Sequence, residues 1–391
     1  MAEVGFFRQA WSSRPFHFFG RTPLINHGAI LAVPGARQQV NHDATQPHHH
    51  WFVNDRSPPF IPAAASSAAE AVARVGQSAR RTVENGRRRL EFHAMSTLCR
   101  VDCHGADAGT IQAFQSETVA WTAGFEARYS RFVPDSLVSR LNAAAGKAWL
   151  AADAEAERIF DQCGEFFRLT GGAFDPTALP LTRLWNWKAS PPAMPTAGAI
   201  AAARELVGWD KIQRRPGEIF LPRAGMSLDL GGIGKEFAVD TVVALARKHG
   251  LAQVLVDFGQ DVRAVGHAPD KPHWLIGLED ARQPGHCWTG VAVTNQAVAS
   301  SGDYQRHFIF NGQRYGHILD PRTGWPASNE VRAASIIAPS CTLAGLLATS
   351  ACVLGVAEAI RLIEKTPDTA GAITTADQRI YSDRFESFIP G

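Results

Sequence analysis

The sequence predicts an α+β fold, in which antiparallel sheets are packed with helices. Helical and strand patterns alternate along the chain, and short hairpins, not only helices, join the strands. The chain has 391 residues, of which 45% are hydrophobic, so it can bury one large core or two lobes. Both observations are typical of a globular protein.

Periodic apolar positions predict the helices, and short apolar runs rich in β-branched residues predict the strands. Helices are expected over residues 151–169, 197–207, 235–249 and 341–354. Strands are expected over residues 253–258, 274–278, 291–294 and 331–338. Asn311-Gly312 supplies the positive-φ positions of a tight turn, so residues 308–310 and 313–315 should form a hairpin.

The first 91 residues differ in composition from the rest of the chain. They contain His48-His49-His50, Pro58-Pro59 and an Ala/Ser stretch at residues 63–73, with no clear periodicity before it. This composition predicts a largely flexible N-terminal extension over residues 1–91 that leads into an alanine-rich helix, and a folded unit over residues 92–391. A start site placed too far upstream would also explain it. The arginines at 80–81 and 87–89 are interpreted as a solvated helix face or a linker.

Charge and cysteine usage limit the partners and the compartment. A formal charge of +2 argues against nucleic acid as the main partner. We find no transmembrane span, no signal core and no early lipid-accepting cysteine, so a cytoplasmic location is expected, with a periplasmic location as the alternative. The six cysteines form no CxxC pair and are expected to be buried free thiols. The oligomeric state is left open.

The segment at residues 297–324, AVASSGDYQRHFIFNGQRYGHILDPRTG, is the most informative. His317 follows the return strand of the expected hairpin, and Ser300-Ser301-Gly302-Asp303 forms a polar bend upstream. A neutral imidazole beside such a bend can take a proton from a hydroxyl near pH 7. Arg322 offers a planar fork for an anion. The alternative interpretation is a capped hairpin with a hydrogen-bonded histidine.

Two further segments contain glycine-rich turns. At residues 226–250, a strand end runs through Asp229 and three glycines into a helix whose first turn contains Lys235. A cation is disfavoured there unless an anion such as a phosphate is bound. At residues 170–187, Phe174 and Asp175 occupy a rigid bend before Pro176 and could hold a heterocycle. The first turn could equally be a tight connection, and Phe174 and Asp175 could equally be a wedge and a turn cap.

These segments occur in the order found in a known family, the FAD:protein FMN transferases, which were once described as thiamine-biosynthesis lipoproteins. The chain resembles this family from about Phe92 to near the C-terminus. The motifs that carry the resemblance are Met95-Ser96-Thr97, PDSLVSRLN (134–142), GAFDPT (172–177), DLGGIGK (229–235), SGDY (301–304), HILDPRTG (317–324) and LATSACVLG (347–355).

The resemblance implies a T-fold-like flavin transferase with one catalytic unit. FMN would pass from FAD to a Thr or Ser hydroxyl of a client protein in a phosphoryl transfer assisted by Mg²⁺, with AMP leaving. It also implies roles by motif position. His317 would deprotonate the client hydroxyl, and Gly232 (by its carbonyl) and Thr349 would bind the metal. The positions that match flavin-dinucleotide contacts are Met95, Ala173, Phe174, Asp175, Asp229 and Lys235.

The chain also departs from the family pattern. The late helix of the family usually reads Ala-Asp-Ala-Leu-x-Thr, but Gly345 stands here at the position of the metal-binding Asp. Smaller departures are Ser96 for Gly, Glu236 where Gly usually follows the Lys, and Gln260 before Asp261. An aspartate at position 345 is expected to restore an oxygen ligand and to tighten Mg²⁺ binding. The alternative function is a catalytically weakened FAD-binding protein or an FAD pyrophosphatase.

Overall fold

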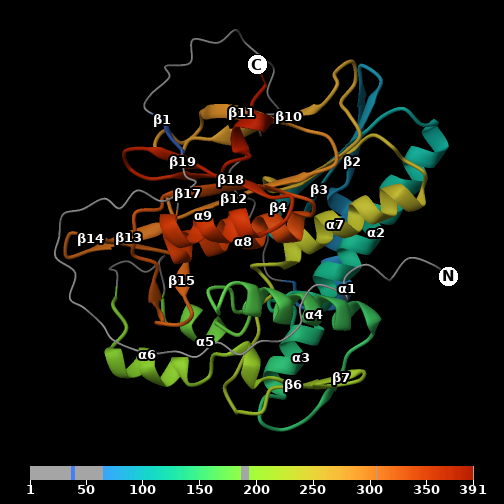
Figure 1. Ribbon diagram of the computed structural model, residues 1–391. Helices are drawn as coiled ribbons and strands as arrows, with labels where there is room; N and C mark the ends of the chain where they lie inside the picture. The colour runs from blue at the N-terminus through green and yellow to red at the C-terminus, as the bar shows by residue number, and fades with distance from the viewer. Residues whose placement is uncertain (1–36, 40–64, 186–192, 305, 391) are drawn as a thin grey trace. The chain divides into compact units, whose positions relative to one another are not determined.

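This computed structural model describes residues 37–39, 65–185, 193–304 and 306–390, all of which belong to one compact unit that spans residues 35–391. Every strand pairing among the described residues is antiparallel. A ten-stranded sheet forms the centre of this unit (Figure 1). Its order is β1 (Arg37–Gln39), β19 (Arg379–Tyr381), β18 (Ala370–Thr374), β17 (Ala333–Ala338), β12 (Ala297–Gly302), β9 (Asp261–Val265), β8 (Val254–Phe258), β4 (Thr97–Cys103), β3 (Arg87–Ala94) and β2 (Arg80–Glu84).

Smaller antiparallel sheets accompany the main one. They are β10 (Trp274–Glu279) with β11 (Cys287–Val293), β13 (His307–Phe310) with β14 (Gln313–Gly316), β15 (Leu319–Asp320) with β16 (Trp325–Pro326), and β5 (Leu150–Ala151) with β7 (Glu218–Phe220) and β6 (Gln213–Arg215). The α-helices are α1 (Ala68–Ser78), α2 (Ala108–Tyr129), α3 (Leu137–Ala143), α4 (Ala154–Leu169), α5 (Leu179–Thr182), α6 (Ala197–Arg204), α7 (Gly234–Lys248), α8 (Cys341–Leu354) and α9 (Val356–Lys365). Two 3₁₀ turns lie at Trp209–Lys211 and Phe385–Phe388.

Alternation along the central strands builds two hydrophobic layers, one on each face of the main sheet. In β8, Val254 and Val256 enter the layer beneath α7 and α8, while Leu255 enters the opposite layer. The hairpin β10–β11 covers that opposite layer with Trp274 and Val291, and Figure 1 shows it on the far side of the sheet from α8. Because side chains in a strand alternate between faces, both surfaces of the sheet are buried near its middle.

The α+β fold is confirmed, and several predicted elements match closely. Helix α8 covers residues Cys341–Leu354 as expected, helix α7 covers Gly234–Lys248, and the hairpin around Asn311-Gly312 forms β13 and β14. All six cysteines are free thiols, of which only Cys287 is half-buried and the others are buried. No helix in the described ranges is long and apolar enough to cross a membrane.

The interpretation of the arginine clusters as a helix face or linker is wrong. Residues 80–84 and 87–94 form the hairpin β2–β3, whose turn at Asn85-Gly86 has φ values of 49° and 73°. The boundary expected at residue 92 therefore falls inside strand β3, and both α1 and β2 precede it within the same unit. The histidine triplet at 48–50 lies outside the described residues, as does most of the expected extension.

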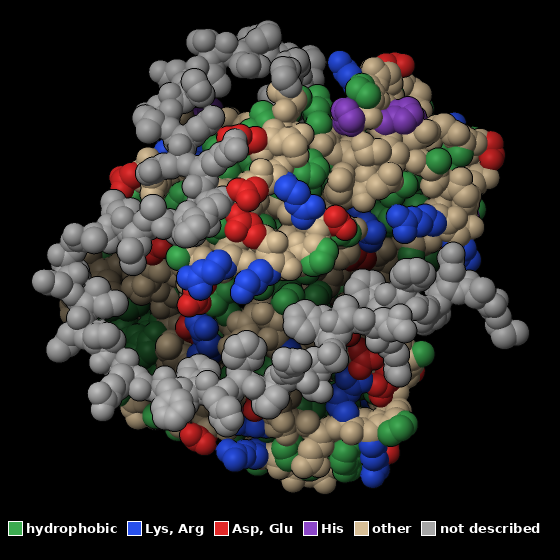
Figure 2. Space-filling view, in the orientation of Figure 1, with side chains coloured by type: hydrophobic (Ala, Val, Ile, Leu, Met, Phe, Trp, Pro, Cys, Tyr) green, Lys and Arg blue, Asp and Glu red, His purple; other side chains and the backbone are tan. Residues whose placement is uncertain are grey.

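Figure 2 shows acidic and basic side chains lying close together across the middle of one face, with hydrophobic side chains between them. This mixture of signs agrees with the formal net charge of +2. On that face, no single charge sign dominates the described surface.

Candidate active site

A cleft of about 880 Å³ opens where the main sheet separates between β9 and β12. Only Ala297 with Arg263 and Val298 with Val262 pair across these two strands, although β12 continues to Gly302 beside β17. Polar side chains from the separated strands, including Asp261, line the opening. Residues of both hydrophobic layers line the cleft, among them Phe174 from one layer and Leu255 and Ile276 from the other.

The cleft gathers most of the residues that the sequence singled out, from four distant segments. Those that line it are Ala173, Phe174, Asp175, Asp229, Gly232, Lys235, His317, Gly345 and Thr349. Met95 does not line it. Met95 lies in the turn between β3 and β4 with φ of 51° and packs against the main core.

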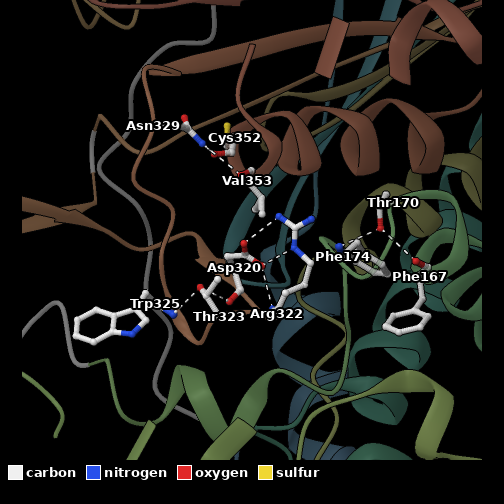
Figure 3. Close-up of polar contacts among 10 residues, drawn as sticks. All are labelled: Phe167, Thr170, Phe174, Asp320, Arg322, Thr323, Trp325, Asn329, Cys352 and Val353. Atoms are coloured by element: carbon white, nitrogen blue, oxygen red, sulfur yellow. Dashed lines mark hydrogen bonds and ion pairs between the residues drawn. The ribbon is translucent and has the colours of Figure 1, made fainter. Parts of the chain in front are cut away.

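The bend at 172–177 and the glycine turn before α7 contact each other directly. The backbone N–H of Asp229 donates to the carbonyl of Pro176 at 2.9 Å, and a Cβ placed on Gly232 would lie 3.5 Å from the Phe174 ring. The N–H of Phe174 donates to the Thr170 hydroxyl at 3.1 Å (Figure 3). The contact between Gly232 and the Phe174 ring is an ordinary van der Waals contact, so the aromatic ring and the glycine turn lie against each other and form one wall of the cleft.

Asp175 holds the bend together, as one of the two interpretations had it. Its carboxylate accepts hydrogen bonds from the N–H and hydroxyl of Thr177 at 2.8 and 2.6 Å, and from the N–H of Trp209 at 3.2 Å. Burial raises the pKa of Asp175 above its ordinary value. The group nevertheless satisfies both oxygens within the protein, which fixes the position of the neighbouring Phe174.

Asp229 organises the glycine turn. One carboxylate oxygen accepts from the N–H of Gly231 at 3.0 Å, and the other accepts from the Nε of Arg131 at 2.8 Å. Helix α7 then begins without a capping side chain, whereas Asp153 caps α4 and Ser340 caps α8. An uncapped helix N-terminus that opens onto a cleft is a favourable place for an anion.

The positive charge of Lys235 is paired with a carboxylate of the protein itself. Its ammonium group forms an ion pair with Asp261, which is buried, while the lysine side chain keeps 30% of its surface exposed. Burial alone would lower the pKa of Lys235, but the carboxylates of Asp261 and Glu236 outweigh it and raise that pKa. Lys235 therefore remains charged, and its unusual position in the first turn of a helix is explained in part by Asp261.

Glu236 is the third residue of α7 and is buried, with 7% of its surface exposed. Burial, followed by the nearby Asp261, raises the pKa of Glu236 to about 7. Its Oε2 atom accepts no hydrogen bond within the described structure. Glu236 also lines the cleft, although in the sequence it stood out only as a departure from the family pattern.

His317 follows β14 and points a half-buried imidazole into the cleft wall. Its backbone N–H donates to the carbonyl of Arg306 at 3.0 Å, and its buried Nδ1 has no hydrogen-bond partner within the described residues. Burial, with a smaller contribution from the charge of Arg306, lowers the pKa of His317 to about 4. The imidazole is therefore neutral near pH 7.

The anion-binding fork expected at Arg322 is already occupied. Its Nε and Nη2 atoms donate to the two oxygens of Asp320 at 2.9 Å each, in a bidentate pair that Figure 3 shows. Of the polar bend, Ser300 belongs to β12 and bonds Ser335 at 2.8 Å, and Ser301 lies 3.3 Å from the hydroxyl of Thr349. The bend expected from the sequence is therefore wrong for residues 300–302, which are extended strand, and Ser300 and Ser301 line the cleft from β12.

Sequence reasoning also missed Asp261 as a member of the site. It follows a tight turn at Gly259-Gln260, where φ is 65° and 76°, and the turn joins β8 to β9 at the edge of the cleft. Gly259 was the local signal for a tight turn, whereas the positive φ of Gln260 is seen only in the structure. Its partner Lys235 lies 26 residues earlier in the chain.

A split antiparallel sheet, an uncapped helix start, a charged lysine and a neutral histidine around one cleft define an enzyme suited to a phosphate ester. The comparisons with known proteins agree with this class. The chain belongs to the ApbE family, whose model matches residues 95–374.

Similar proteins extend the match over most of the chain. It is 32% identical over 303 residues to a FAD:protein FMN transferase of Treponema pallidum, covering 73% of this chain and 84% of that protein. Solved structures that resemble it include the ApbE protein of Thermotoga maritima, with a TM-score of 0.70 and 27% identity over 78% of this chain and 99% of that one. The flavin transferase ApbE of Vibrio cholerae gives a TM-score of 0.69 and 25% identity over 80% and 100%. The resemblance seen in the sequence is confirmed, and the enzyme class is that of the flavin transferases.

Proposed function

We propose that this chain moves FMN from FAD onto a Thr or Ser hydroxyl of a client protein and releases AMP. The observation that carries the proposal is that a neutral histidine and an uncapped, lysine-bearing glycine turn share one cleft of about 880 Å³. Cavities of roughly 300–1,000 Å³ suit ligands of this size class. A base for a hydroxyl and a binding place for a pyrophosphate are the two requirements of this reaction.

The reaction balances with groups that the cleft provides. The client oxygen attacks the phosphorus on the FMN side of the FAD pyrophosphate, and the bond from that phosphorus to the bridging oxygen breaks, so AMP leaves with that oxygen. His317 takes the hydroxyl proton, which passes to solvent after AMP has left. Lys235 stabilises negative charge on the phosphate oxygens, and the N–H groups of the glycine turn orient them. Phe174 offers an apolar ring surface beside the turn.

The cleft offers few protein donors for a divalent cation. No group of three or more His, Cys, Asp or Glu side chains able to hold a metal occurs among the described residues. Thr349 and Gly232 line the cleft, and the hydroxyl of the first and the main-chain carbonyl of the second would suit a hard cation that FAD phosphates also bind. When bound, Mg²⁺ would neutralise charge on the pyrophosphate. Both of these protein donors are uncharged, so neither supplies a negatively charged ligand for the cation.

The test is direct. Purified protein is incubated with FAD, Mg²⁺ and a set of peptides that each contain one Thr or Ser, and the peptides are weighed by mass spectrometry. We expect a peptide to gain one FMN while AMP appears in equal amount. His317→Gln should abolish this gain. Release of AMP and free FMN with every peptide unmodified would instead identify a pyrophosphatase.

A further inference from the structure

One oxygen of the Glu236 carboxylate, Oε2, is buried without a hydrogen-bond partner among the described residues. The residue is 7% exposed and lines the cleft. A buried polar oxygen left without a partner costs stability, so such a group in a native fold calls for a ligand or a function. The mechanism proposed above makes no use of Glu236.

Gly345, on the neighbouring helix α8, explains how this side chain fits. A Cβ placed on Gly345 would lie 2.6 Å from Cγ of Glu236 and 2.9 Å from its Oε1 atom. Real Cβ atoms do not approach other atoms so closely. The side chain of Glu236 therefore fills the volume that any side chain at position 345 would need, and the two positions face each other across the contact between α7 and α8.

The surroundings of this carboxylate favour a cation. Thr349 lies one helical turn after Gly345, on the same face of α8, and its hydroxyl lines the same cleft. Among the charged neighbours, Asp261 and Asp240 add negative charge and Lys235 adds positive charge, but Asp261 already pairs with Lys235. A carboxylate against Gly345 and a hydroxyl one helical turn further along the same helix supply oxygen donors of the kind that a hard divalent cation prefers.

We propose that Glu236 supplies the anionic oxygen ligand of the divalent cation in this cleft, reaching from α7 into the space that Gly345 leaves open on α8. The inference rests on the proposed function, and it identifies the charged ligand that Thr349 and Gly232 lack. It also corrects an expectation from the sequence. Gly345→Asp alone would place a second carboxylate against Glu236, so it should not tighten metal binding.

The experiment uses Mn²⁺ as the probe, with free Mn²⁺ measured by electron paramagnetic resonance in the presence of FAD and without peptide. Glu236→Gln and Glu236→Ala should each lower the affinity for Mn²⁺ at least about ten-fold, because each removes the anionic ligand of the site. Gly345→Asp should bind Mn²⁺ no tighter than the parent. The double variant Glu236→Ala/Gly345→Asp should return to within about three-fold of the parent, because the aspartate then occupies the vacated space. Glu358→Gln is the matched control, since Glu358 is the exposed third residue of α9, and it should change nothing.

Unchanged Mn²⁺ binding in both Glu236 variants would overturn the inference. A double variant as weak as Glu236→Ala would also overturn it, because positions 236 and 345 would then not share a metal site. Glu236→Gln keeps the size of the side chain, so it decides the question if Glu236→Ala does not fold. Flavin fluorescence with FAD and no metal separates this failure from failure of the proposed function: a parent that binds no FAD contradicts the function, whereas FAD binding with unaltered Mn²⁺ affinity contradicts only the ligand role.

Discussion

The half-buried imidazole of His317 gives the most discriminating prediction. Replacing it by glutamine keeps a polar side chain of similar size but removes the base, so kcat for FMN transfer should fall about 10²- to 10⁴-fold. The dissociation constant for FAD should change less than about two-fold, because a base for the client hydroxyl contributes little to ground-state binding. Transfer is followed by peptide mass and FAD binding by flavin fluorescence. A variant that transfers FMN at the parent rate would remove His317 from the mechanism.

The pH dependence of the same residue tests its environment. Burial lowers the pKa of His317 to about 4 from an ordinary value of 6.5. At pH 5.5 an ordinary histidine would be about 90% protonated, but His317 should be only about 3% protonated. Between pH 6.5 and pH 4 the unfolded chain takes up a proton that the folded chain does not. The free energy of unfolding should therefore fall with decreasing pH in this window, by up to about 3 kcal/mol, relative to the glutamine variant.

The measurement is a histidine NMR titration of the FAD-free protein, with the His317 signal assigned by its absence in His317→Gln. A titration is preferred to a rate profile because Glu236 lies in the same cleft and has a pKa of about 7. Urea unfolding of both proteins at pH 7 and pH 4.5 supplies the stability difference. A His317 midpoint between pH 6 and 7, with no extra loss of stability in acid, would refute the half-buried, partner-free imidazole described above.

Three further predictions concern the scaffold of the cleft. Lys235→Ala should weaken FAD binding and lower the free energy of unfolding by about 2 kcal/mol, which is less than for a fully buried ion pair because Lys235 is partly exposed. Adding Asp261→Asn to this variant should recover much of the lost stability. Unaltered FAD titrations would show that the ion pair is only structural. Gly259→Ala should lower the free energy of unfolding, measured in urea, by at least about 2 kcal/mol, because φ is 65° there and the new Cβ would lie 2.2 Å from a threonine hydroxyl. The control Gly250→Ala has φ of 71° but open space around the new Cβ, so it should lower that free energy by about 1 kcal/mol. Asp240→Ala should destabilise by about 2–4 kcal/mol, because this carboxylate accepts the first two N–H groups of α8 at 2.8 and 2.9 Å and pairs with an arginine at 2.6 Å; a thermal midpoint equal to that of the parent would contradict the described link between α7 and α8.

Local signals predicted those elements whose boundaries are set by local chemistry. Helix α8 begins after Ser340, whose hydroxyl accepts an N–H from the first turn, and ends at Gly355, where φ is 81°. The hairpin around Asn311-Gly312 likewise depends on two residues that tolerate positive φ. In both cases the residues that fix the boundary lie within the element or beside it, so the sequence alone contains the information.

The hairpin β2–β3 was missed because its charge pattern concealed its alternation. All five residues of β2 are exposed, as suits an edge strand that charged side chains protect from pairing with another chain. In β3, Leu90, Phe92 and Ala94 are buried and their neighbours are not, which is the two-residue period of a half-buried strand. The arginine cluster was interpreted from its composition, whereas the alternation of these three apolar residues indicates a strand.

The partners of the site residues could be predicted only where they are neighbours in the sequence. Asp320 lies two residues before Arg322, so their bidentate pair could have been expected. Lys235 and Asp261 meet because α7 packs across β8 and β9, and no local pattern reports that contact. The same limit applies to pKa values, since burial lowers that of His317 and burial is a property of the fold.

Glu236 and Gly345 are two departures from the family pattern that compensate each other through their contact in the fold. The sequence alone does not show this contact. Taken singly, Gly345 indicates a lost metal ligand, and Glu236 is a residue that could complement the helix start or crowd a phosphate. In the fold, the larger side chain enters the space that the smaller residue leaves, so volume is conserved and one carboxylate remains in the cleft wall. Because the two side-chain positions overlap, a carboxylate at 345 is compatible with this packing only when Glu236 is removed. The two residues must therefore be exchanged together, and a single reversal at either position disturbs both the packing and the charge of the cleft.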